Sequence, residues 1–215
     1  MAASAEKGII LYGYWMSSCS WRVRAALTMK KIPFEERNVD IVKEKKQLTE
    51  QYRAINPAQK VPALDIDGAV LVESMAIIQY LEETRPQPPL TPSTPLLRAR
   101  MREICDIVVA GIQPLQNFGL KAHFAKEDDY VKFTKYWTER GLRTLEDLLS
   151  KSTGKYCIGD QITLADICIV PQLYNAVSRH GLDLSKYPKV AKVYDALNNE
   201  QVFKETHPVS VKAKM

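Results

Sequence analysis

The first third of the chain alternates short apolar runs of strand character with segments whose apolar residues recur at helical spacing. Val23, Ala26 and Leu27 lie on one face of such a segment, which is rich in helix-forming residues. Asp67-Gly68, between two apolar runs, is a strong hairpin signal. The predicted strands are 9–14, Phe34–Val39, Ala63–Ile66 and Val70–Glu73, and the predicted helices are 19–31, Lys43–Tyr52 and one capped by Ser74 and ending at Thr84. This order, β-α-β-α-β-β-α, predicts an α/β domain.

A proline-rich stretch over 86–95 separates this part from a second part that is helical in pattern. Five of the twelve prolines fall within the stretch, so we expect a semi-rigid extended linker. The predicted helices that follow are Leu96 to about Phe124 with a kink or break at Pro114, then Tyr130–Leu149, then 164 to about 178. The last begins at the capping box Thr163–Asp166, to which we assign a structural role. The expected division is an α/β domain over 1–85, a linker over 86–95 and an all-α domain over 96–215.

Composition and charge narrow the class of protein. A hydrophobic content of 46% predicts a globular core. The net charge of +5 is modest, and Lys43, Lys45 and Lys46 are expected to form a solvated helix face, so nucleic acid is not an expected partner. No apolar segment reaches the length of a membrane span. Widely spaced cysteines and histidines without metal-ligand spacing predict free thiols, no metal site and a cytosolic protein.

Residues 17–24, Ser-Ser-Cys-Ser-Trp-Arg-Val-Arg, lie where the first predicted strand gives way to the first predicted helix. Two hydroxyls and a thiol therefore stand at a helix N-terminus, which carries free N–H groups and partial positive charge. Such an end stabilises a bound thiolate and lowers the pKa of a nearby thiol. The pattern is typical of a site that holds a ligand sulfur as an anion. The same residues are also compatible with an alternative in which a serine is an ordinary N-cap and Cys19 packs as a small apolar residue.

This octapeptide resembles the signature of the zeta-class glutathione transferases, also called maleylacetoacetate isomerases. The resemblance covers roughly residues 8–208 and includes Asn56-Pro57, Val61-Pro62, Glu73-Ser74, Ile112–Asn117, and Gly159-Asp160 with Thr163–Asp166. It implies the glutathione transferase fold, with a thioredoxin-like first domain, a helical substrate-binding domain and a cis bond between Val61 and Pro62. It also implies a homodimeric enzyme that uses glutathione to isomerise maleylacetoacetate to fumarylacetoacetate in tyrosine and phenylalanine breakdown.

Glutathione presents a thiol, two carboxylates and an ammonium group, and the resemblance implies residues for each. Ser17 or Ser18 donates to the thiolate beside Cys19, and the choice between the two serines stays open. The other expected glutathione contacts are Ser20, Trp21, Arg22, Gln47 at the glycine end, the Val61 backbone, Glu73 for the ammonium, Ser74 for the γ-glutamyl carboxylate, Gln113 and Asn117. Zeta enzymes often carry Gln where this chain has Glu73, but other classes use an acidic residue there.

The expected substrate is small and acidic or electrophilic. Arg179 lies close to where the family carries a carboxylate-binding arginine, although the local spacing is one residue longer here, and Arg22 is an alternative anchor. Other functions stay open. Cys19 would suit a thiol oxidoreductase of omega-class or glutaredoxin-like type, and a transferase that detoxifies xenobiotic or halogenated compounds would share the glutathione site. A scaffold with the same fold would not need the intact octapeptide.

Overall fold

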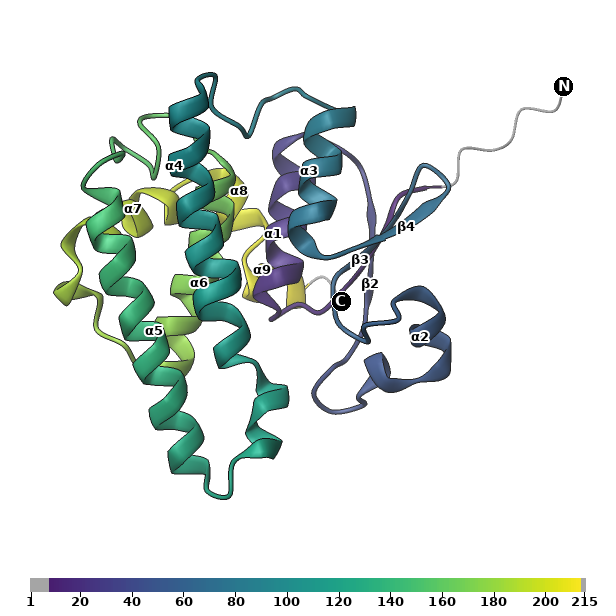
Figure 1. Ribbon diagram of the computed structural model, residues 1–215. Coiled ribbons are helices and arrows are strands. Elements are labelled where there is room, and N and C mark those ends of the chain that lie inside the picture. The colour runs from purple at the N-terminus through teal and green to yellow at the C-terminus, as the bar shows by residue number, and fades with distance from the viewer. Residues whose placement is uncertain (1–7, 214–215) are drawn as a thin grey trace, which may run out of the picture. The chain divides into compact units, whose positions relative to one another are not determined.

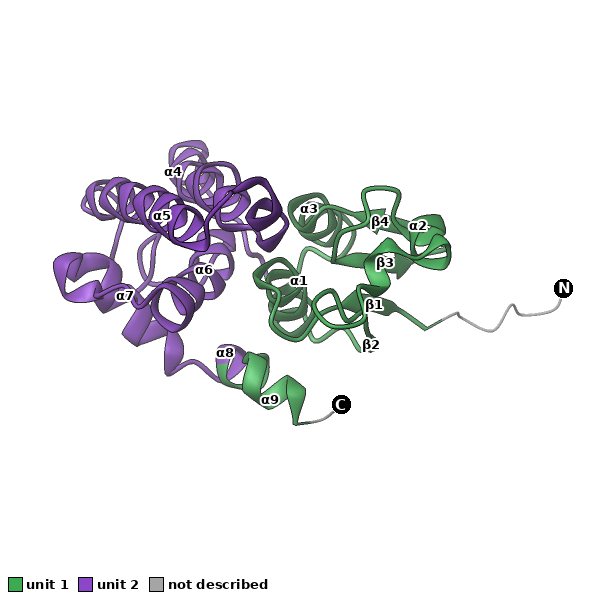
Figure 2. Cartoon of the chain, turned by 90° about the horizontal axis from the view of Figure 1, so that it is seen from below, with its two compact units in different colours: residues 1–88, 204–215 green, residues 89–203 purple. Residues whose placement is uncertain are grey.

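The computed structural model describes residues 8–213, which form two compact units. The first unit runs to Pro88 and resumes at Lys204, and the second comprises Pro89–Phe203; Figure 2 colours them separately. This division differs from the expected one, because the last residues of the chain return to the first unit instead of completing the helical domain. The first unit contains a four-stranded sheet with helices, and the second unit is all-helical, as the sequence predicted.

The first unit is built on a four-stranded mixed sheet in the order β2-β1-β3-β4. Its strands are β1 (Ile10–Gly13), β2 (Glu35–Asn38), β3 (Ala63–Ile66) and β4 (Ala69–Val72). Strand β1 pairs in parallel with β2, while β3 is antiparallel to both β1 and β4. The predicted hairpin is confirmed: Asp67 and Gly68 have φ of 52° and 80°, as a two-residue turn of this kind requires.

Three helices cover this sheet. They are α1 (Ser18–Met29), α2 (Glu50–Ile55) and α3 (Ser74–Thr84). Helices α1 and α3 pack together on one face, and α2 lies on the other (Figure 1). Leu11 and Leu64 from the sheet are completely buried, as are Val23 of α1 and Ile77 and Leu81 of α3, so the apolar pattern predicted the core of this unit correctly.

Two local predictions in this unit are wrong. The expected helix Lys43–Tyr52 is instead a 3-10 turn, Lys46–Leu48, followed by α2, because the Asp40 carboxylate accepts the N–H groups of Val42 and Lys43 and turns the chain. The three lysines expected on a helix face are exposed, but only Lys46 belongs to the 3-10 turn. Ser74 is the first residue inside α3, and Glu73 occupies the N-cap position without a side-chain bond.

The C-terminal residues return to α1 through two short helices, α8 (Gln201–Glu205) and α9 (Pro208–Lys212). Thr206 lies between them and accepts two hydrogen bonds. Its hydroxyl accepts from the Trp21 indole N–H at 2.8 Å, and its carbonyl accepts from Arg24 at 3.2 Å. These bonds join residues about 180 positions apart, a long-range pairing that no local pattern in the sequence indicates.

The second unit is a helical bundle. Its main helices are α4 (Pro95–Asp106), α5 (Glu127–Leu149), α6 (Leu164–His180) and α7 (Pro188–Asn198). Short turns of 3-10 or π type connect them: Ile107–Ile112, Gln113–Gln116, Phe118–His123 and Leu184–Lys186. Among the described helices, none is long and apolar enough to cross a membrane. Residues 8–213 also contain no group of three or more His, Cys, Asp or Glu side chains placed to hold a metal ion.

The predicted helix from Leu96 to Phe124 ends much earlier than expected. It leaves α-helical geometry at Ile107, seven residues before Pro114, and continues as a π-helical turn. Ile112 in this turn packs directly onto Gly141 of α5, where the Ile112 side chain leaves no room for a Cβ. Packing between neighbouring helices therefore selects the wider turn, and Pro114 only marks where the following 3-10 turn begins.

The predicted capping box at the start of α6 is confirmed. Asp166 is completely buried, and its carboxylate accepts the Thr163 N–H at 2.7 Å and the Cys157 N–H at 2.9 Å. Burial raises the pKa of this carboxyl above its ordinary value. Asp166 thus fixes the helix start and ties a neighbouring loop to it, which is the structural role assigned from the sequence.

Candidate functional site

The first turn of α1 carries the hydroxyl groups expected to meet a thiolate. Ser17 is the N-cap, and its Oγ accepts the Ser20 N–H at 3.2 Å, so the hydroxyl proton is left to donate elsewhere. Ser18 is the first helical residue and is 6% exposed, and its hydroxyl makes no hydrogen bond within residues 8–213. Cys19 is half-buried with a free thiol. Two donors and a thiol therefore stand at the positive end of one helix.

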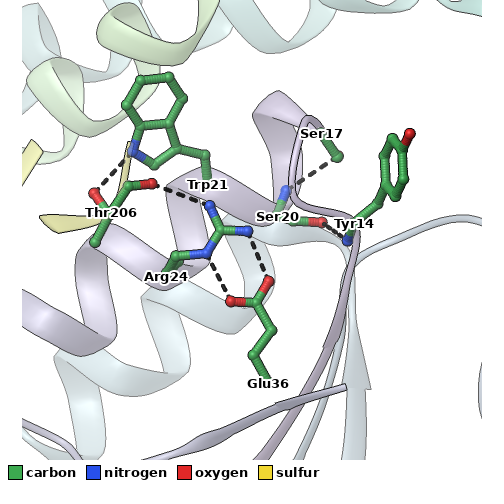
Figure 3. Close-up of polar contacts among 7 residues, drawn as sticks. All are labelled: Tyr14, Ser17, Ser20, Trp21, Arg24, Glu36 and Thr206. Carbon is green, nitrogen blue, oxygen red and sulfur yellow. Dashed lines mark hydrogen bonds and ion pairs between the residues drawn. The ribbon is translucent and has the colours of Figure 1, made fainter. Parts of the chain in front are cut away.

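Ser20 and Trp21 have a different role from the one expected. The Ser20 hydroxyl is completely buried and accepts the Tyr14 N–H at 3.2 Å, which fixes the loop before the helix. Trp21 is 1% exposed, and its indole bonds to Thr206 (Figure 3). Both side chains point into the core of the first unit, so they position the loop and offer no surface to glutathione. The octapeptide is thus part binding loop and part core.

Arg22 lies between the starts of two helices. Its side chain is 1% exposed, and its Nη1 lies 3.3 Å from the Ser74 Oγ and 3.8 Å from the Cys19 Sγ. The contact with Ser74 brings the first residue of α3 to the first turn of α1, as the glutathione hypothesis requires. Because the guanidinium is buried, it is not an exposed anchor for a diacid substrate.

Val61 and Glu73 flank the same sheet. The Val61-Pro62 bond is cis, as the resemblance implied, and within the described residues the Val61 N–H and C=O make no hydrogen bond, so both can pair with an added strand. Glu73 is exposed and has φ of 66°, a region that costs a non-glycine residue free energy and that clusters at functional sites. Its carboxylate faces solvent at the N-terminus of α3.

Gln47 is half-buried beside the turn at 40–43. Its amide nitrogen donates to the Ile41 carbonyl at 3.3 Å, and its Oε1 is buried with no partner among the described residues. A buried amide oxygen without a donor is unusual in a folded protein. A contact between Gln47 and the glycine end of glutathione stays a prediction.

The second unit brings together part of the expected substrate side. Arg179, near the end of α6, lies over the Phe118 ring with its guanidinium carbon 4.2 Å from the ring centroid. Phe118 follows Asn117, whose amide oxygen accepts the Gly119 N–H at 2.9 Å and caps a 3-10 turn. Gln113 begins the preceding turn and is half-buried. The Gln-Pro-Leu-Gln-Asn run and Arg179 therefore lie on neighbouring segments of one unit.

No role was predicted for Gln116 from the sequence, although it belongs to the Gln113–Asn117 run. It is buried, and its amide nitrogen donates to the Gln172 amide oxygen on α6 at 3.0 Å. The Tyr130 hydroxyl of α5 donates to the Gln116 carbonyl at 3.2 Å. Gln116 thus ties the run to two helices, and no local pattern in the sequence indicates this, because its partners lie on α5 and α6.

Family models and relatives agree with this geometry. The model of the glutathione S-transferase N-terminal domain matches residues 11–89, and that of the C-terminal domain matches residues 117–205. A relative from Drosophila melanogaster, named probable maleylacetoacetate isomerase 1, is 49% identical over 93% of this chain and 81% of its own length.

Solved structures extend the comparison to the whole fold. The holo structure of a maleyl pyruvate isomerase, a bacterial zeta-class glutathione S-transferase, has a TM-score of 0.88 at 36% identity and covers 94% of this chain and 97% of its own. A maleylacetoacetate isomerase from Anaeromyxobacter dehalogenans 2CP-1, with dicarboxyethyl glutathione and citrate in its active site, has a TM-score of 0.83 at 36% identity, covering 96% and 97%. Fold and matches define a glutathione S-transferase, and the chain belongs to the zeta class of that family.

Proposed function

We propose that this enzyme uses glutathione to isomerise maleylacetoacetate to fumarylacetoacetate in tyrosine and phenylalanine breakdown. The observation that carries the proposal is the 49% identity to an isomerase of that name over 93% of the chain, together with the intact octapeptide at the start of α1. The dicarboxyethyl glutathione in a similar isomerase supports a site that accepts a dicarboxylate joined to glutathione sulfur.

Glutathione binding rests on the first unit. A hydroxyl of Ser17 or Ser18 donates to the sulfur, and the positive end of α1 favours the thiolate over the thiol. Lowering the thiol pKa by two units requires about 2.7 kcal/mol, which a hydrogen bond to a charged acceptor and a helix end can supply. The Val61 backbone pairs with the cysteinyl unit, Glu73 takes the ammonium group, and Ser74 at the start of α3 takes the γ-glutamyl carboxylate.

The reaction is addition, rotation and elimination. The thiolate adds to one carbon of the cis double bond, forming a C–S bond and an enolate on the conjugated carbonyl. The former double bond is now single and rotates. The enolate then reforms the double bond in the trans geometry and expels the thiolate, so glutathione is regenerated. Arg179 holds a substrate carboxylate through its planar guanidinium, which keeps the acidic substrate in place while the bond rotates.

One observation favours a second candidate function, thiol–disulfide chemistry at Cys19. The Cys19 sulfur is only half-buried in the first turn of α1, and the Arg22 Nη1 lies 3.8 Å from it. In that case the Cys19 sulfur would attack the disulfide bond of a glutathionylated substrate, so that a new disulfide forms between Cys19 and glutathione while the old one breaks and releases the substrate thiol. The serine pair, which the oxidoreductase does not need, makes the isomerase the better-supported function.

A side-by-side rate comparison tests the proposal. Maleylacetone, a close analogue of the substrate, should be turned over faster than chlorodinitrobenzene and dichloroacetate at equal glutathione concentration. If chlorodinitrobenzene were much the best substrate and maleylacetone gave no product, the general transferase function would replace the isomerase. Disulfide exchange by the wild type that is lost in Cys19→Ala would support the oxidoreductase instead.

A further inference from the structure

Helix α1 carries buried cations that differ in how their charge is balanced. Arg24 donates through Nε and Nη2 to both carboxylate oxygens of Glu36, at 2.8 and 2.7 Å. Lys30, at the end of the helix, forms an ion pair with Glu82. Arg22 is at least as buried as these two, yet no described carboxylate lies within 4.0 Å of its guanidinium, and its Nε and Nη2 have no hydrogen-bond partner among the described residues.

An unbalanced buried charge is unfavourable for folding. Removing a charge from water costs free energy that a nearby opposite charge normally offsets, as it does for Arg24 and Lys30. Arg22 lacks that offset, so its presence is not explained by the stability of the fold. Such a group is expected where an anion completes the arrangement, because the charge interaction then becomes favourable only with the ligand bound.

The position of the guanidinium indicates which anion. Nη1 contacts the Cys19 sulfur in the first turn of α1 and the Ser74 hydroxyl at the start of α3. Both helix N-termini already carry partial positive charge, and Arg22 adds a full charge between them without reaching the surface. Since the charge is buried, the surrounding water screens it less than it would screen an exposed arginine.

We propose that Arg22 is a positioning residue which, acting through Ser74 and Cys19, holds the thiol of bound glutathione as the thiolate. This inference rests on the proposed binding of glutathione in the first unit. The unpaired charge costs the free protein stability and stabilises the anionic cofactor. Arg24 and Glu36 form the matched control, since their paired charges lie on the same helix and neighbouring strand and have no net charge to offer the thiol.

The test compares Arg22→Met with the double variant Arg24→Met/Glu36→Leu. Calorimetry first establishes that wild-type protein binds glutathione, and ultraviolet absorbance against pH then gives the pKa of the bound thiol. Arg22→Met should raise this pKa by about one unit, a tenfold loss of thiolate at a given pH below it, while the melting temperature stays equal or rises. The control should leave the pKa unchanged.

The outcomes separate this inference from the proposed function. Failure of the wild type to bind glutathione would overturn the proposed function itself. Normal binding with the same thiol pKa in Arg22→Met would overturn only the role of Arg22, and a lower melting temperature with that unchanged pKa would make the residue purely structural. If Arg22→Met does not fold, Arg22→Gln, which removes the charge but keeps a donor for Ser74, should show the same rise in pKa.

Discussion

Ser17 combines two roles in one hydroxyl group. Its oxygen caps α1 by accepting the Ser20 N–H, and its proton is left to donate to a sulfur. A loss of activity in Ser17→Ala would therefore mix a weaker helix start with a missing donor. A substitution that keeps the N-cap acceptor but removes the hydroxyl donor distinguishes these two effects.

We predict that Ser17→Ala or Ser18→Ala lowers isomerase turnover by about 10²-fold, because a donor to the thiolate is lost. Ser17→Thr retains both cap and donor and should keep most activity. Ser17→Asp retains the cap but offers no donor at neutral pH, so it should be as inactive as Ser17→Ala while melting like the wild type.

Cys19→Ala should lower turnover less than the serine variants do. Loss of all activity in Cys19→Ala, with both serines dispensable, would favour the oxidoreductase.

The contact between Arg179 and Phe118 can be tested by substitution of either residue. Phe118 is 48% exposed, and its ring covers one face of the Arg179 guanidinium. A planar guanidinium binds a carboxylate through its edge, so the stacked ring would orient Arg179 for that contact. Arg179→Ala should raise KM for maleylacetone at least about tenfold, and Phe118→Leu should raise it several-fold, without changing KM for glutathione. Phe118→Tyr preserves the ring and is the control. An unchanged maleylacetone rate in Arg179→Ala would show that the carboxylate anchor lies elsewhere.

At the scale of elements, α9 depends on a neutral histidine. His207 is its N-cap, and the ring Nδ1 accepts the Val209 N–H at 3.2 Å, which it can do only when unprotonated. Burial lowers the pKa of His207 below its ordinary value of 6.5, and burial together with the charge of Arg179 does the same for His180 in the second unit. The folded state therefore favours the neutral form of both imidazoles.

These shifts predict how stability depends on pH. A base with a lowered pKa in the folded state binds more protons when unfolded, so its contribution to stability is complete above pH 6.5 and is lost as the pH falls below 6.5. The melting temperature should thus fall on acidification through this window. His207→Asn keeps an N-cap acceptor but does not titrate, so it should show a weaker fall. An identical pH dependence in His207→Asn and wild type would contradict the role of this residue.

Local sequence signals predicted elements well where the determinants are local. Asp67-Gly68 correctly predicted the hairpin, and Thr163 with Asp166 correctly predicted the start of α6, because turn and cap residues act within a few positions of the chain. The break in the helix after Asp106 was misplaced, since it depends on how Ile112 meets Gly141 on another helix. Trp21 and Ser20 were taken for binding residues for a similar reason: their burial depends on Thr206 and Tyr14, and only the folded chain shows it.

At the scale of the whole molecule, we expect a homodimer, as the family resemblance implies. The described residues include exposed apolar side chains on α4, at Leu96 and Leu97, and on β4, at Val70, which such an assembly would shield from water. Light scattering at working concentration should give twice the chain mass of 24.4 kDa. A mass equal to one chain would contradict the prediction.

The decisive experiment asks whether glutathione is regenerated as a cofactor or consumed as a substrate. Purified enzyme is given maleylacetone in large excess over glutathione, and both the trans product and the free thiol are measured over time. We predict that each glutathione molecule supports many turnovers and that the free thiol concentration stays constant, since elimination returns the thiolate. Product that stops at one equivalent of glutathione, with loss of the thiol, would show conjugation instead, and formation of the trans product at the same rate without glutathione would contradict the proposed chemistry entirely.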